Sequence, residues 1–274
     1  MEVYNEMNCK IIFLDIDGTL TNSKKVITKP TLDALIEAQK QGIILAVASG
    51  RPDTGVLPIT KQLKLDEFGG YMLSFNGARV KNCKTNQVIY ENSLTLDAFK
   101  LACEVSKLHN CPIITYNDNY IISEVAENKY MDIEAKINKI PVKVVKSMVD
   151  FVDYRPTKCL VLGDGDYLAT VEPIMKSALD GLANVYRSEP YFIEVVPRGI
   201  DKAVSIAKLI DTIGIDQSET MAFGDGFNDI SMIKYVAHGV AMENGCDLIK
   251  QSADYITTSN DNDGVAKFLY ENVL

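Results

Sequence analysis

The stretch KIIFLDIDGTL, residues 10–20, contains the strongest indication of the fold. An apolar run at residues 11–14 is followed directly by Asp15, Asp17 and Gly18. A short apolar run that ends in acidic residues and glycine is typical of a buried strand that runs into a turn. The two carboxylates stand one residue apart where the strand ends. Both can therefore reach one reacting centre, one as a nucleophile and the other as an acid or base.

The next segments continue as a helix and a second strand. Thr28 is an expected N-cap, and the apolar residues after it fall on one helical face until Gly42 ends the helix. Residues 43–48 are continuously apolar, as expected of a strand that is buried on both faces. This strand is expected to stop at Ser49-Gly50-Arg51-Pro52, because glycine and proline interrupt regular structure.

The same alternation returns near the C-terminus. Apolar residues between 203 and 210 have helical spacing, Gly214 is the expected helix end, and residues 220–223 form a short strand that stops at Gly224-Asp225-Gly226. Another helix is expected from about Gly264. Strands that alternate with helices predict an α/β fold, in which a parallel sheet carries helices on both faces.

The middle of the chain has a different pattern. Residues 113–116 and 120–123 flank Asn117-Asp118-Asn119, which predicts a β-hairpin, and helical stretches are expected at residues 95–108 and 164–178. We therefore predict a catalytic core formed by residues 1–81 and 198–274. Residues 82–197 are expected to form an α+β domain inserted into it.

Composition and charge exclude several classes of protein. The 274 residues are 47% hydrophobic and 24% charged, which is typical of a globular protein, and the apolar runs are too short to cross a bilayer. The N-terminus lacks the pattern of a secretion signal. A net charge of −9 disfavours nucleic acid and anionic membranes as partners. The six cysteines form no CxxC pair, so we expect free thiols and a cytoplasmic location.

Four polar clusters are predicted at the ends of parallel strands or the start of a helix, and such ends converge at one edge of a sheet. An aspartate that attacks a phosphate group needs a neighbouring cation, and carboxylate oxygens are ligands that Mg²⁺ prefers. A lone lysine at a helix start is usually solvated, so the prediction rests on the four clusters together. They are Asp15 with Asp17, Ser49 with Gly50, Lys202, and Asp225 with Asn228 and Asp229.

These clusters, in this order, resemble the four signature motifs of the haloacid dehalogenase-like phosphohydrolases. The motifs are Asp15-x-Asp17-Gly18-Thr19, Ser49-Gly50-Arg51, Lys202, and Gly224-Asp225-Gly226-x-Asn228-Asp229. The insertion resembles the large α/β (type IIB) cap of the Cof-type branch, which also has an Asn-Gly-Ala turn, here at residues 76–78. The resemblance implies a Rossmann-like core, a cap domain, Mg²⁺ as cofactor and a small phosphorylated metabolite, such as a sugar phosphate, as substrate.

The resemblance also implies a role for each motif residue. Asp15 is expected to be the nucleophile and a metal ligand, and Asp17 the acid/base, with its backbone carbonyl offered to the metal. Lys202 is expected to pair with the nucleophile and the phosphate. The remaining expected roles are phosphoryl binding by Ile16, Ser49, Gly50 and Asn228, metal ligation by Asp225, and metal ligation or support of the ligands by Asp229.

Two other enzymatic or signalling functions use similar residues. A sugar phosphomutase would use the same nucleophile but return the phosphoryl group to a sugar hydroxyl. A phospho-acceptor signalling domain also combines aspartates, a hydroxyl residue and a lysine on a parallel sheet, although Asp17 and the large insertion argue against it. A non-catalytic binding module is disfavoured because every expected catalytic group is present.

Overall fold

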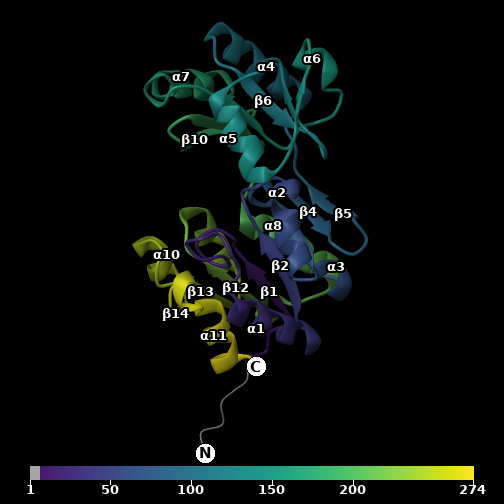
Figure 1. Cartoon of the computed structure of the whole chain (residues 1–274), viewed down its shortest axis with the longest axis vertical. Helices are drawn as coiled ribbons and strands as arrows, with labels where there is room; N and C mark the ends of the chain where they lie inside the picture. Colours follow the sequence, from purple (N-terminus) through teal and green to yellow (C-terminus); the bar gives the residue numbers. More distant parts are fainter. Residues whose placement is uncertain (1–6) are drawn as a thin grey trace, which may run out of the picture. The chain divides into compact units, whose positions relative to one another are not determined.

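The computed structural model describes residues 7–274, which form two compact units (Figure 1). Of the described residues, the first unit contains residues 7–50, Val56–Tyr90 and Asp201–Leu274. The second contains Arg51–Gly55 and Glu91–Ile200. The domain boundaries inferred from sequence, at residues 82 and 197, stay a prediction. In the structure the chain passes between the units at residues 50–51, 55–56, 90–91 and 200–201.

The first unit is built on an eight-stranded sheet with β1 near its centre. The strand order is β14-β13-β12-β1-β2-β3-β4-β5. Six strands, from β14 to β3, are parallel, and β4 runs antiparallel to β3. The expected α/β class with a parallel-sheet core is confirmed. The strands are β1 (Ile11–Leu14), β2 (Ile44–Ala48), β3 (Tyr71–Ser74), β4 (Arg79–Asn82), β5 (Val88–Glu91), β12 (Thr220–Gly224), β13 (His238–Met242) and β14 (Tyr255–Thr257).

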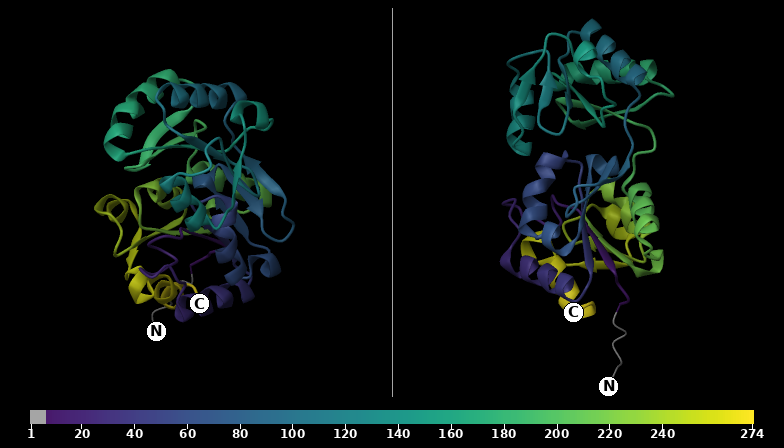
Figure 2. Two further views of the ribbon diagram at one scale, coloured as in Figure 1. Left: turned by 45° about the horizontal axis from the view of Figure 1, so that its top comes forward. Right: turned by 90° about the vertical axis from the view of Figure 1, so that its right-hand side faces the viewer.

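Helices cover both faces of this sheet, as Figure 2 shows. Because side chains alternate along a strand, Ile12 and Leu14 face one apolar cluster with α1 and α11, whereas Ile11 and Phe13 face another with α8 and α9. Burial on both faces explains why β1 and β2 are continuously apolar. The helices are α1 (Lys29–Lys40), α2 (Asp53–Gln62), α3 (Leu65–Phe68), α8 (Lys202–Ile213), α9 (Ile230–Tyr235), α10 (Asp247–Ser252) and α11 (Gly264–Asn272).

The helix boundaries follow capping signals in the sequence. The Thr28 side chain accepts a hydrogen bond from the Thr31 N–H, so Thr28 is the N-cap of α1 as expected. Gly214 takes the left-handed conformation, at φ +70°, that ends α8. Across residues 7–274, no helix combines the length and the hydropathy that a membrane crossing requires.

The order of the parallel strands reverses at β1, which pairs with β2 on one side and β12 on the other. In this register Leu14 lies opposite both Val47 and Phe223. The loops that follow β1, β2 and β12 therefore leave the sheet at the same edge and at neighbouring positions. Ligands of open α/β sheets bind at such a reversal point, outside the carboxyl ends of the strands.

The second unit contains a six-stranded sheet in the order β10-β11-β9-β6-β7-β8. The predicted hairpin is confirmed, since β6 and β7 pair antiparallel around the turn at residues 117–119. Helices α4 and α7 pack with the sheet in one apolar cluster. The elements are α4 (Leu96–Leu108), β6 (Ile113–Tyr116), β7 (Ile121–Ser123), α5 (Lys129–Asn138), β8 (Val142–Val144), α6 (Met148–Phe151), β9 (Cys159–Leu162), α7 (Gly165–Ala178), β10 (Asn184–Glu189) and β11 (Phe192–Val196).

Candidate active site

The loop after β1 places Asp15 at the edge of the sheet. The backbone N–H of Asp15 donates to the carbonyl of Phe223 on β12 (3.1 Å), and its carbonyl accepts from the N–H of Leu20 (3.2 Å). Gly18, at φ +89°, supplies the left-handed conformation that turns the chain back. Asp15 is therefore held through its backbone from two sides and is only 6% exposed.

Lys202 is the buried cation of this edge. It is the first residue of α8, whose N-cap is Asp201, and it is 1% exposed. Its ammonium donates to Oδ1 of Asp15 (2.7 Å), to Oδ1 of Asp229 (2.5 Å) and to the carbonyl of Ala48 (2.9 Å). Burial alone would lower the pKa of Lys202, but the two carboxylates outweigh it and keep that pKa above its ordinary value. Lys202 is therefore charged, and all three of its donors are used.

The loop after β12 supplies two further carboxylates. Oδ2 of Asp229 accepts from the backbone N–H groups of Gly226 (3.0 Å) and Asp225 (3.2 Å), so both oxygens of Asp229 have donors. Oδ1 of Asp225 accepts from the hydroxyl of Thr19 (2.8 Å), which links the loops after β1 and β12. Each of Asp15, Asp225 and Asp229 offers an oxygen, and the three oxygens lie within 4.8 Å of one another.

This carboxylate cluster fits a hard divalent cation. Three acidic side chains share a single ammonium, so negative charge remains in excess when all are ionised. Burial, then the neighbouring Asp229, raises the pKa of Asp15 to about 8, although Lys202 acts in the opposite direction. Burial also raises the pKa of Asp225. Oxygen-only donors of this kind suit Mg²⁺ or a similar ion, which would relieve the repulsion.

We expect cation binding at this cluster to release protons. With a pKa of about 8, Asp15 is mostly protonated at about pH 6.5 in the cation-free protein and must ionise to become a ligand. Isothermal titration of MgCl₂, in buffers of different ionisation enthalpy, should show release of about one proton per cation at this pH and far less at about pH 9.5. Asp15→Asn should lose most of this release. Binding without proton release at the lower pH would contradict the assignment.

Gly18 permits the close approach of the two loops. A Cβ at this position would lie 2.7 Å from Cγ and 2.9 Å from Oδ1 of Asp225. We expect Gly18→Ala to displace that carboxylate and weaken Mg²⁺ binding about 10- to 100-fold, as measured by titration calorimetry. Gly42→Ala is the matched control, because Gly42 has nearly the same φ, +93°, but open space around it. Equal losses of affinity in the two variants would show that backbone strain alone is responsible.

The candidate phosphoryl-binding residues lie on the neighbouring loops of the first unit. Ser49 is buried directly after β2, and its backbone joins the loops around it: its N–H donates to Leu73 (2.8 Å), and its carbonyl accepts from Asn76 (2.8 Å). Nδ2 of Asn228, after β12, donates to Oδ1 of Asn76 (3.3 Å). Ile16 buries its side chain and so can offer a ligand only backbone atoms.

Asp17 lies outside the three-carboxylate cluster. Its side chain is 37% exposed, and Oδ1 accepts a hydrogen bond from the ammonium of Lys25 (2.8 Å). This partly exposed carboxylate, two residues after Asp15, is accessible to solvent. This position suits a proton-transfer group better than a side-chain metal ligand.

Four contributors to the site were not among the predicted site residues. Thr19 belongs to the first motif and Asn76 to the Asn-Gly-Ala turn, but the sequence predicts no contact for either residue. Asn244 donates from Nδ2 to the carbonyl of Gly18 (2.8 Å) and so supports the same turn. Lys25 has no signal in the sequence, because its contact with Asp17 depends on how the loop after β1 folds.

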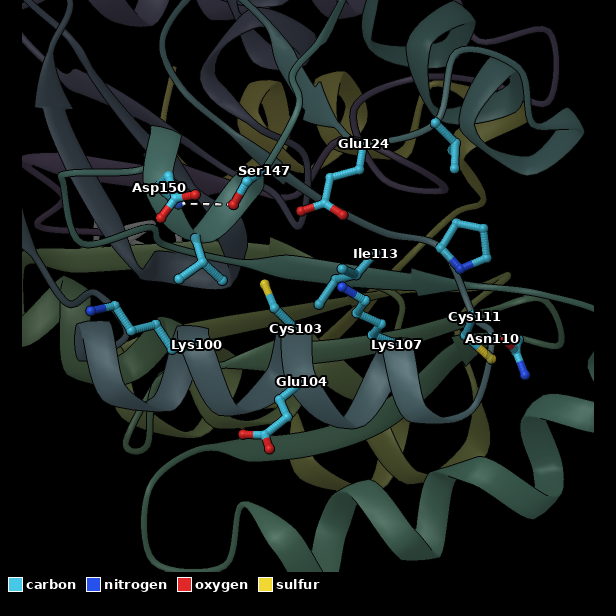
Figure 3. A pocket seen from close by; sticks show the side chains of 13 residues that line it. Lys100, Cys103, Glu104, Lys107, Asn110, Cys111, Ile113, Glu124, Ser147 and Asp150 are labelled. Atoms are coloured by element: carbon cyan, nitrogen blue, oxygen red, sulfur yellow. Dashed lines mark hydrogen bonds between the residues drawn. The ribbon is translucent and has the colours of Figure 1, made fainter.

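A separate cavity of about 630 Å³ lies in the second unit, between α4 and residues 147–150 (Figure 3). Cys103, on α4, lines this cavity together with Lys100, Lys107, Glu124 and Asp150. Burial, together with the carboxylate of Glu124, raises the pKa of Cys103 to about 12, so its thiol is protonated and a poor nucleophile. None of the predicted site residues lines this cavity.

The chain is similar in sequence and in structure to known hydrolases. The family model of the haloacid dehalogenase-like hydrolases matches residues 12–269. A crystal structure of a haloacid dehalogenase-like hydrolase from Bacteroides thetaiotaomicron is 42% identical in sequence, with a TM-score of 0.92, and the match covers 96% of this chain and 99% of that one. The sugar phosphatase BT4131, of haloacid dehalogenase subclass IIB, is 26% identical, with a TM-score of 0.77 and coverage of 96% and 98%.

A relative of named activity matches over nearly its whole length. The 5-amino-6-(5-phospho-D-ribitylamino)uracil phosphatase YcsE of Bacillus subtilis is 30% identical over 98% of each chain. The expected enzyme class, a phosphoric monoester hydrolase, is confirmed by these matches. With its family model matched from the first strand to the last helix, the chain belongs to the haloacid dehalogenase-like hydrolases.

Proposed function

We propose that this phosphatase hydrolyses small phosphorylated metabolites by way of an aspartyl-phosphate on Asp15, with Mg²⁺ as cofactor. The observation that carries the proposal is the buried ammonium of Lys202, 2.7 Å from Oδ1 of Asp15 and 2.5 Å from Oδ1 of Asp229. This contact orients one oxygen of Asp15 and leaves the other to react. Asp225 and the phosphoryl-binding candidates on adjacent loops support the same centre.

In the proposed first step, a carboxylate oxygen of Asp15 attacks phosphorus and the bond from phosphorus to the ester oxygen breaks. Asp17 donates its proton to the departing alkoxide, which leaves as an alcohol. In the second step Asp17 accepts a proton from water, and the water oxygen attacks phosphorus. Inorganic phosphate leaves, and Asp15 is regenerated as a carboxylate.

The remaining residues neutralise and orient the phosphoryl group. The hydroxyl of Ser49, the N–H of Gly50, the backbone of Ile16 and the amide of Asn228 are the proposed donors to its oxygens. Lys202 offsets part of the negative charge. When bound, Mg²⁺ would supply further charge compensation; Asp15, Asp225 and the Asp17 carbonyl are its proposed ligands, with Asp229 either ligating or holding the loop. The donors already present on both Asp229 oxygens favour the second alternative.

The substrate class is proposed from two relatives. BT4131 is named as a sugar phosphatase, and YcsE acts on a compound with a phosphorylated ribityl chain. Both names describe a phosphate ester on a polyhydroxylated carbon chain. We therefore propose a sugar phosphate or polyol phosphate as the substrate.

A screen of phosphorylated metabolites with MgCl₂ tests this function. We expect sugar and polyol phosphates to be hydrolysed faster than nucleoside monophosphates or phosphoamino acids, and EDTA to stop the release of inorganic phosphate. Labelled phosphate should appear in solution and not on a second hydroxyl of the sugar. Turnover that survives EDTA would contradict the role of the metal, and label retained on sugar would indicate a mutase.

A further inference from the structure

The turn that follows β3 contains three successive residues with positive φ. They are Phe75 (φ +52°), Asn76 (φ +56°) and Gly77 (φ +90°). Only glycine adopts this conformation without cost, and asparagine tolerates it better than most other residues. Backbone strain of this kind persists where the surrounding structure over-determines it, often at a functional site. Chain reversal alone therefore does not explain why Phe75 and Asn76 keep positive φ, and the contacts of this turn matter.

Asn76 contacts the loop after β2 through both its backbone and its side chain. Its N–H donates to the carbonyl of Ser49 (2.8 Å). A Cβ built on Gly50 would lie 3.2 Å from both amide atoms of Asn76, so this amide lies directly against Gly50. Asn76 thus abuts two residues that are candidates for binding the phosphoryl group.

The same side chain orients Asn228. Nδ2 of Asn228 donates to Oδ1 of Asn76 (3.3 Å), and Oδ1 of Asn228 lies 2.7 Å from where a Gly226 Cβ would stand. Asn228 is exposed, and without these neighbours its amide could rotate freely. Nδ2 has two hydrogens, and only one is needed for Asn76. The other remains for a ligand beside Gly50.

The turn is also fixed to the helix that begins at Lys202. A Cβ on Gly77 would lie 3.1 Å from both Cβ of Ser205 and the carbonyl of Asp201, so only glycine permits this approach to α8. The turn therefore connects the loop after β2, the loop after β12 and the start of α8. Each of these three segments contains a proposed phosphoryl-binding residue.

We infer that Asn76 is a positioning residue, whose amide holds the Asn228 side chain beside the Ser49-Gly50 loop so that Asn228 can donate to a phosphoryl oxygen. The inference rests on the proposed function, in which Ser49, Gly50 and Asn228 bind that group. Asn76 acts through Asn228, and its own contact with the substrate is not required. A purely conformational role, in which Asn76 only tolerates positive φ, predicts a different response to mutation.

Asn76→Gly separates the two roles, because glycine removes the amide and suits the backbone conformation at least as well. If Asn76 positions Asn228, kcat/KM for p-nitrophenyl phosphate and the affinity for inorganic phosphate should each fall about 10- to 100-fold, the effect of one hydrogen bond to a charged group. Asn76→Ala should show the same losses. Asn86→Gly is the matched control, since Asn86 also has positive φ (+60°) but lies in the turn between β4 and β5. It should leave both quantities unchanged.

A double-mutant cycle with Asn228→Ala decides whether Asn76 acts through Asn228. In the Asn228→Ala background, Asn76→Gly should cause little further loss of phosphate affinity or kcat/KM. Fully additive losses would overturn the inference, as would wild-type values in both single variants at position 76. Phosphate affinity is measured by titration calorimetry with MgCl₂, so it does not depend on turnover.

The two measurements, phosphate affinity and kcat/KM, separate this inference from the proposed function. If the wild type hydrolyses no phosphate ester but binds inorganic phosphate in an Asn76-dependent manner, the proposed function fails and the inference stands. If esters are hydrolysed and neither affinity nor kcat/KM responds to Asn76, the proposed function stands and the inference fails. A wild type that binds no phosphate would overturn the inference as well.

Discussion

Asp15→Asn should abolish phosphate release, lowering kcat by at least ~10⁴-fold, because an amide cannot replace the attacking carboxylate. The change is nearly isosteric, and the amide oxygen can still accept from the ammonium of Lys202, as Oδ1 does now at 2.7 Å. The measurement is steady-state release of inorganic phosphate from the best metabolite of the screen. Rapid acid quenching with labelled substrate should trap a phosphorylated Asp15 peptide in the wild type only.

The stability of the same variant gives an independent test. The ordinary pKa of Asp is 3.8 and that of folded Asp15 is about 8, so the folded protein without cation binds one more proton than the unfolded chain between these values. Stability due to Asp15 is therefore present below about pH 4 and is lost as pH rises toward about 8. Asp15→Asn should remove this loss and be at least as stable as the wild type at about pH 8 in EDTA.

Asp33→Asn is the control for Asp15→Asn. Asp33 lies on α1, is about half exposed and pairs with Lys29, so its replacement should leave turnover unchanged. Turnover of Asp15→Asn above about 1% of wild type would exclude a nucleophile whose loss is worth several orders of magnitude. An Asp15→Asn protein that is inactive and also unfolded would instead indicate a structural role.

Lys202→Met should be strongly destabilising. Methionine matches the length of the lysine stem but leaves Asp15 and Asp229 buried without the cation that now contacts both. Breaking a buried ion pair from one side costs about 3–5 kcal/mol in the free energy of unfolding. Urea unfolding in EDTA measures this loss. In MgCl₂, the added charge should restore part of the stability, while kcat stays ~10²- to 10³-fold below wild type.

Lys158→Met is the matched control for Lys202→Met. Lys158 is also buried, in the second unit, but faces the single carboxylate of Glu194 at 3.5 Å. Its replacement should destabilise the protein without any recovery in MgCl₂, because no acidic cluster adjoins it among the described residues. An unfolding free energy of Lys202→Met within about 1 kcal/mol of wild type would show that the buried carboxyl groups of Asp15 and Asp229 do not depend on Lys202.

Local signals predicted the fold well where one segment determines its own structure. The N-cap at Thr28 and the turn at residues 117–119 depend on side chains that accept hydrogen bonds from nearby backbone N–H groups, and the end of α8 at Gly214 depends on the tolerance of glycine for positive φ. The continuous apolar run of β2 follows from helices on both faces of the sheet. Each of these features leaves a pattern in residues within a few positions of one another, so the sequence alone could reveal it.

The sheet that β4 and β5 join could not be predicted from their sequences. Strands β4 and β5 continue the eight-stranded sheet beyond β3, so the sheet extends past residue 82 as far as Glu91. A strand-like pattern shows that a segment will pair, but not which sheet it will join. That choice depends on the edge available after β3 and on the turn at residues 75–77, where the chain reverses.

The sequence by itself determined which polar side chains the candidate site has and that they lie at strand ends and at a helix start. Apolar periodicity, glycine and capping residues act locally, so a single segment is enough to predict these positions. Only the tertiary structure decided how those groups share charge. Lys202 contacts Asp15 across 187 positions of the chain, and Asn228 contacts Asn76 across 152. Such contacts follow from strand order and register. Strand order and register depend on how the whole sheet packs, so they cannot be predicted from any single segment.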